Sequence, residues 1–180
     1  MNSSDKNERI FIHNSIESIE TSISDQLASL SLPESHAKLI KAIALISPEG
    51  GEEKGFTKEQ IAAGACVDTE RGFVYLVLNI KPAIAHEIGH LVWQRLLTKE
   101  KQEDFNRLQE KNGKEILNML QRVARKHQSN AILPREHFIM NDEGSLEEFF
   151  AWSYALHVYK DIQFHEQSPT IDHWLNTNVF

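Results

Sequence analysis

The sequence predicts an α+β fold that is mostly helical and carries one small β-sheet. Apolar residues recur every three or four positions in several segments, which is the spacing of an amphipathic helix. Between two of these segments, residues 73–79 are rich in Phe, Val and Tyr, which favour strands. The chain of 180 residues is long enough for one hydrophobic core, and its 41% hydrophobic and 25% charged residues are ordinary for a globular protein.

Charge and composition argue against several classes of protein. The net charge of −7, from 19 basic and 26 acidic side chains, argues against a nucleic-acid partner. No membrane span is expected, because a transmembrane helix needs about 20 apolar residues and the longest uncharged apolar run covers only 73–80. The single cysteine, Cys66, cannot form an intramolecular disulfide. Its apolar neighbours predict a buried thiol at the start of a strand.

The first 55 residues predict a helical segment that packs on the rest of the chain. Residues 15–30 place five apolar side chains at helical spacing. Pro33 ends that helix and favours a second one, whose apolar spacing continues to about residue 47. The sequence SPEGGEEKG, over 47–55, then predicts a loop and the boundary with a second segment, 56–180. We expect the two segments to form one compact unit.

The second segment predicts two short strands followed by helices. Strands are expected at GACVD, over 64–68, and over 73–79, with a turn at 70–72. The later strand therefore leads directly into a helix. Helices are expected over 57–63, 83–97, 99–111, 114–127, 146–159 and 171–180, and an irregular segment over 129–144.

The pentapeptide HEIGH, in the first turns of the helix over 83–97, has the spacing of a zinc protease site. His86 and His90 are four residues apart, so both imidazoles lie on one side of the helix and can bind one Zn²⁺. Glu87 lies about 100° round the helix, close enough to accept a proton from water at the zinc. The alternative is a chance match, a hydrogen-bonded histidine pair with a solvated glutamate. Gly89 lowers helix propensity by about 1 kcal/mol, which indicates that another element packs closely there.

A catalytic zinc usually has three protein ligands, so a third is required. The helix over 146–159 begins with Glu147 and Glu148 among aromatic and aliphatic residues, where an unbound carboxylate would be costly. The alternative is a capping box, in which Glu148 reaches back to Ser145. Spacing alone does not choose between Glu147 and Glu148. His157, nine residues after Glu148, points to the opposite face and is not expected to join the same metal.

HEIGH followed by EEFFAWSYALHVYKD resembles the catalytic domain of anthrax lethal factor and its relatives, which include the clostridial Pro-Pro endopeptidases. These are zinc proteases whose third ligand is the glutamate directly before Phe-Phe-Ala. The resemblance covers about residues 65–180 and is specific only at the two motifs. It implies a mostly helical, zincin-like α+β domain with a small sheet over the HExxH helix. It also implies one Zn²⁺ per chain, held by His86, His90 and Glu148, with Glu87 as the base.

Two positions depart from the pattern of this family. Relatives place a tyrosine, which hydrogen-bonds the oxyanion, seven residues before the third ligand, and this chain has Asn141 there. Relatives also commonly carry an acid four residues after that ligand, where this chain has Trp152. Asn141 or His137 is the remaining candidate for oxyanion support, although a solvated loop histidine is the more ordinary interpretation of His137. A missing oxyanion donor typically lowers the rate about 10²–10³-fold.

Together, these residues predict a zinc metalloendopeptidase that acts on a protein or peptide substrate. The resemblance implies a secreted or injected, toxin-like effector protease. The alternatives are a relative that binds zinc or a partner without cleaving it, and an intracellular regulatory protease. The N-terminus shows no signal peptide, which predicts a cytoplasmic location with signal-independent export left open. The strand over 73–79 is expected either at the sheet edge, paired with an extended substrate, or as an ordinary core strand.

Overall fold

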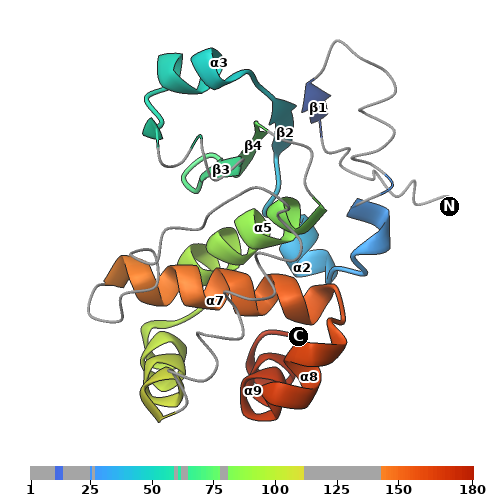
Figure 1. Ribbon diagram of the computed structural model, residues 1–180, viewed down its shortest axis with the longest axis vertical. Coiled ribbons are helices and arrows are strands. Elements are labelled where there is room, and N and C mark those ends of the chain that lie inside the picture. Colours follow the sequence, from blue (N-terminus) through green and yellow to red (C-terminus); the bar gives the residue numbers. More distant parts are fainter. Residues whose placement is uncertain are drawn as a thin grey trace, which may run out of the picture.

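The computed structural model contains both helices and strands, which confirms the α+β prediction. The structure describes residues 11–13, 25, 27–58, 61, 65–77, 81–111 and 143–180. Its elements are β1 (Phe11–His13), α2 (Glu34–Ala37), β2 (Ala42–Leu45), α3 (Pro48–Glu53), β3 (Ala65–Asp68), β4 (Phe73–Leu76), α5 (Lys81–Arg95), α7 (Glu143–Val158), α8 (Ile162–Gln167) and α9 (Pro169–Asn178). Residues 99–111 are also helical. In Figure 1 the sheet lies at one end, α5 and α7 run across the middle, and α8 and α9 lie at the other end.

The four described strands form one sheet in the order β1-β2-β4-β3. β1 and β2 pair in parallel, as do β2 and β4, while β3 runs antiparallel to β4. The turn expected at 70–72 joins β3 to β4, and Gly72 occupies it with a φ of +75°. A side chain at Gly72 would also meet the carbonyl oxygen of Leu39, so both the backbone conformation and the space require glycine.

The strands β1 and β2 correct the prediction of a wholly helical N-terminal segment. Residues 42–45 pair with β4 in register, Ala42 opposite Phe73 and Leu45 opposite Leu76. Ile43 is fully buried at the centre of this pairing. Hydrogen bonding to a strand distant in sequence has therefore overridden the helical spacing of the apolar residues in this segment. The sheet joins strands from both sides of the boundary predicted at residue 55.

The segment predicted as a loop over 47–55 contains the short helix α3, so that prediction was wrong. Ser47 is its N-cap, and the Ser47 hydroxyl accepts a hydrogen bond from the Gly50 amide at 3.1 Å. Glu49 adds a negative charge in the first turn, which favours a helix N-terminus. These two local contributions offset the low helix propensity of the glycines.

Most of the later elements agree with the prediction. β3, β4, α5 and the helix over 99–111 fall within two residues of their expected positions where described. α7 begins at Glu143, inside the segment predicted as irregular, and α8 was not predicted. The Asp161 side chain caps α8 by accepting a hydrogen bond from the Phe164 amide at 3.0 Å. The helix over 114–127, and most of those over 15–30 and 57–63, lie outside the described residues.

Helices α5 and α7 form the centre of the hydrophobic core. Both are buried along most of their described length, and aromatic side chains join them to the neighbouring helices. Phe105, on the helix over 99–111, is fully buried. Its ring contacts four other aromatic rings from α5, α7 and α9: Trp93, Phe149, Phe150 and Trp174. No helix in the described part of the chain is long and apolar enough to cross a membrane.

Candidate metal centre

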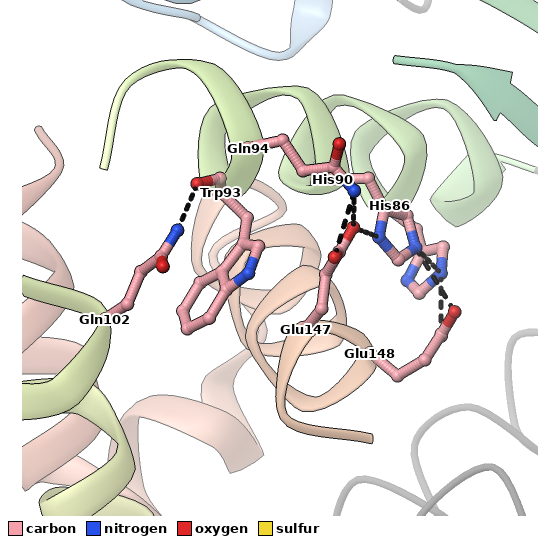
Figure 2. A network of polar contacts seen from close by, with 7 residues as sticks. All are labelled: His86, His90, Trp93, Gln94, Gln102, Glu147 and Glu148. Atoms are coloured by element: carbon pink, nitrogen blue, oxygen red, sulfur yellow. Dashed lines mark hydrogen bonds and ion pairs between the residues drawn. The ribbon is translucent and has the colours of Figure 1, made fainter. Parts of the chain in front are cut away.

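Helix α5 presents the HEIGH motif toward α7. Its three polar side chains, His86, Glu87 and His90, are all buried, with 8%, 5% and 9% of their surface exposed. The Nε2 atoms of His86 and His90 lie 3.1 Å apart, as their spacing of four residues predicts. Figure 2 shows both imidazoles directed toward the start of α7.

Glu148, on α7, completes a group of three side chains that could hold a metal ion. Its Oε2 lies 3.2 Å from His86 Nε2, and its Oε1 lies 3.3 Å from His90 Nε2. The structure therefore brings together the three residues that the sequence and its family resemblance put forward. The alternative of a capping box is wrong, because α7 begins at Glu143 and Ser145 lies inside the helix.

The spacing of these donor atoms fits a zinc ion. Zinc bonds of 2.0–2.1 Å in a tetrahedron place neighbouring donor atoms about 3.3–3.4 Å apart. The two Nε2 atoms lie 3.1 Å apart, and a different oxygen of Glu148 lies near each of them, at 3.2 Å and 3.3 Å, so each of these contacts is close to this value. Two imidazoles and one carboxylate are also a donor set that zinc uses in catalytic sites, where the fourth position is left for water or substrate.

Gly89 allows α5 and α7 to approach closely enough for this site to form. A Cβ atom at Gly89 would lie 2.7 Å from Ala151 Cα and 3.1 Å from the Ala151 carbonyl oxygen. Ala151 lies three residues after Glu148 on α7, so the contact holds α7 at the distance from which Glu148 reaches both histidines. This confirms the expectation of a closely packed neighbour at Gly89.

Gly89→Ala should lower the free energy of unfolding by about 1–3 kcal/mol, the usual cost of overpacking. Alanine raises helix propensity by about 1 kcal/mol, but the new methyl group would overlap the backbone of α7 at Ala151. α7 must then move away from α5 and carry Glu148 with it, so zinc affinity should fall as well. Urea unfolding and zinc titration of the same protein measure both effects.

Gly50→Ala is a matched control for this substitution. Gly50 is also helical, in α3, but the nearest atoms to its added Cβ are Ser47 Oγ at 3.6 Å and Ile46 Cβ at 3.8 Å. These are ordinary contacts, so Gly50→Ala should leave the free energy of unfolding unchanged or raise it by up to about 1 kcal/mol. Equal unfolding energies for Gly89→Ala and the wild type would contradict the close approach.

Burial and charge shift the pKa values of the acidic groups in opposite directions. Burial raises the pKa of Glu87, and the charges of Glu148 and Glu147 add to this rise against the opposing effect of the two histidines. Burial also favours the neutral form of Glu148, but the neighbouring charges and hydrogen bonds of His86 and His90 outweigh it and lower the pKa of Glu148. The two carboxyl groups therefore differ in the direction of their pKa shift, upward for Glu87 and downward for Glu148.

Glu147, the alternative ligand that spacing did not exclude, binds the other side of His90. Its Oε1 lies 2.7 Å from His90 Nδ1. Gln94 Nε2 donates to both oxygens of Glu147, at 3.0 Å and 3.1 Å. Sequence analysis missed Gln94. The available signal was its position four residues after His90, on the same side of α5.

The second nitrogen of His86 has a different environment. His86 Nδ1 is buried and has no hydrogen-bond partner among the described residues. The ring of Trp152 lies 4.5 Å from the imidazole, centroid to centroid, and is itself buried. The two histidines therefore differ at Nδ1: His90 Nδ1 contacts the Glu147 carboxylate, whereas the His86 ring packs against an indole.

A second group of histidine and carboxylate side chains lies in the C-terminal helices. Asp172 Oδ1, on α9, is 2.6 Å from His157 Nδ1 on α7 and 2.8 Å from His165 Nδ1 on α8. These three side chains could also hold a metal ion. Both separations from Asp172 Oδ1, however, are shorter than the edge of a zinc tetrahedron, about 3.3 Å, and fit direct hydrogen bonds. We therefore assign them to hydrogen bonding between three helices, and His157 lies away from the first site as expected.

Strands β3 and β4 of the sheet both contact the motif helix α5. Cys66, on β3, is buried as predicted, and burial together with the charge of Glu87 raises the pKa of its thiol to about 12. The strand expected over 73–79 is β4, which has β2 on one side and β3 on the other. β4 is therefore the core strand of the two alternatives and does not offer an edge to a substrate.

Two predicted residues, Asn141 and His137, lie outside the described residues, so their role in oxyanion support stays a prediction. We found no match between this chain and any model of a protein family, any curated protein or any solved structure. The geometry of the site is therefore the basis for the function proposed below.

Proposed function

We propose that the chain is a zinc-dependent metalloendopeptidase with a zincin-like fold. The observation that carries this proposal is the convergence of the donor atoms of His86, His90 and Glu148, with Glu87 buried on the same helix as the two histidines. A structural zinc site would not need a further buried carboxylate beside its ligands. A glutamate between two histidine ligands is the arrangement that zinc hydrolases use to activate water.

Different residues of the chain would bind the metal and transfer the proton during peptide hydrolysis. His86, His90 and Glu148 would hold the metal. When bound, zinc supplies Lewis-acid chemistry, which acidifies water and polarises a carbonyl group. Glu87 takes a proton from the attacking water and passes it to the nitrogen of the leaving amine. Its burial beside the proposed ligands keeps the carboxylate close to both steps.

The outer edge of β3 is the place in the described sheet where an extended substrate would pair. β1 and β3 are the two outer strands of the described sheet. Of these, β3 carries Cys66, and the charge of Glu87 contributes to the raised pKa of the Cys66 thiol. Main-chain pairing along β3 would therefore bring a peptide bond close to the base. Main-chain hydrogen bonds would bind peptides of many sequences equally well. Contacts with the side chains of the substrate would therefore have to determine which sequence is cleaved.

The test is cleavage by the zinc-loaded protein of an unfolded protein mixture and a peptide library, followed by mass spectrometry. New internal cleavage products are expected. Removal of zinc by a chelator should abolish them, and added zinc should restore them. Zinc binding with no cleavage would favour a second candidate, a zinc- or partner-binding relative without activity. That candidate is motivated by Asn141, which stands where the resembling family has its oxyanion-binding tyrosine.

A further inference from the structure

Two consecutive residues of α7 bind the two nitrogens of one imidazole. Glu148 contacts His90 Nε2 at 3.3 Å, and Glu147 contacts His90 Nδ1 at 2.7 Å. Neighbouring residues in a helix point about 100° apart, so α7 can reach both edges of the ring from the same turn. Figure 2 shows Glu147 and Glu148 on either side of the His90 ring.

The contact with Glu147 selects one tautomer of His90. A carboxylate only accepts hydrogen bonds, so the proton of a neutral His90 resides on Nδ1. Nε2 then offers its lone pair on the side of His86 and Glu148, where the proposed zinc would bind. A histidine ligand whose other nitrogen donates to a carboxylate is oriented and made more basic.

Gln94 fixes the position of the Glu147 carboxylate. The Gln94 side-chain amide donates to both of its oxygens, at 3.0 Å and 3.1 Å, from one turn beyond His90 on α5. His90, Gln94 and Glu147 thus form a bridge between α5 and α7. Within the described part of the chain, His86 Nδ1 has no hydrogen-bond partner, and the neighbouring indole of Trp152 can only donate through its nitrogen.

We propose that Glu147 is the positioning residue of the metal centre, which it supports through His90 and not as a ligand. This inference rests on the proposed function, since it assumes that His86, His90 and Glu148 bind zinc. Glu147 sets the orientation and tautomer of one ligand, His90, whereas the Nδ1 atom of His86 has no such carboxylate partner among the described residues.

The test is the zinc dissociation constant, measured by competition with a chelating indicator. Glu147→Ala should weaken zinc binding about 10–100-fold, as loss of an outer carboxylate usually does. Glu147→Gln, which keeps an oxygen acceptor, should recover part of this loss. Glu103→Ala, at an exposed position on the helix over 99–111, is the matched control and should bind zinc like the wild type.

Long-range ¹H–¹⁵N NMR of the zinc-loaded proteins gives a second readout that a purely structural role would not change. The wild type should show His90 protonated at Nδ1, and Glu147→Ala should alter the Nδ1 signal of His90 more than that of His86. A folded Glu147→Ala protein with wild-type zinc affinity and an unchanged His90 signal would overturn this inference alone. A wild type that binds no zinc would overturn the proposed function with it.

Discussion

Glu87→Gln should lower the rate of peptide hydrolysis by about 10²–10⁴-fold, the usual contribution of a general base, while zinc stays bound. The substitution keeps the size and polarity of the side chain but removes its ability to take a proton. Water cannot easily replace this base, because Glu87 is only 5% exposed. Zinc should be retained because Glu87 is not one of the three converging donors. Initial rates on a cleavable peptide, with zinc analysis of the same samples, measure both quantities.

The same substitution at an exposed glutamate controls for this result. Glu103 lies on the helix over 99–111 and faces solvent, so Glu103→Gln should hydrolyse the peptide at the wild-type rate. If Glu87→Gln keeps the wild-type rate, Glu87 is not the base. If it loses both zinc and activity, Glu87 acts as a ligand, and the assignment of Glu148 has to be revised.

Local sequence signals were sufficient to predict helix α5 and the strands β3 and β4. The histidine spacing of HEIGH predicts that both imidazoles lie on one side of a helix, and α5 places them there. Gly89 was expected to mark a close neighbour, and the neighbour is Ala151. The strands β3 and β4 were predicted from their β-forming residues and the turn between them. For α5, β3 and β4, residues close in sequence determine the structure.

Pairing between distant segments explains the incorrect predictions in the N-terminal segment. The residues of β2 have helical apolar spacing, and their strand conformation depends on β1 and β4, which lie about 30 residues away on either side. α3 formed despite two glycines because Ser47 caps its first turn. An N-cap contributes about 1 kcal/mol, which is enough to favour the helical conformation of such a short segment within the folded protein.

The roles of Glu147 and Glu148 could not be separated from the sequence for a geometric reason. Both residues lie on the first part of α7, about 100° apart round the helix. Which of them faces His86 depends on how α7 is rotated against α5, and the contact between Gly89 and Ala151 fixes that rotation. In the structure, Glu148 contacts the Nε2 atoms of both histidines, whereas Glu147 contacts the Nδ1 atom of His90.

His86→Ala and Glu148→Ala should each remove most of the bound zinc from a wild type that holds one zinc per chain. Each substitution leaves two donors in place of three, and two are too few to hold a catalytic zinc firmly. His157→Ala is the matched control, because His157 belongs to the hydrogen-bonded group with Asp172 and should not affect the zinc content. Elemental analysis of protein purified without any chelator gives the number of zinc ions per chain directly.

Zinc-dependent stability provides an independent measure of the same ligand set. A ligand that binds only the folded state stabilises it by about 2.7 kcal/mol at a free concentration one hundred times its dissociation constant. Thermal unfolding of the wild type and of His157→Ala should therefore shift upward when zinc is added, while that of His86→Ala and Glu148→Ala should not. If only His86→Ala loses the shift, the third ligand is not Glu148, and Glu147 becomes the first residue to test. If the wild type shows neither bound zinc nor a shift, the metallopeptidase proposal is wrong.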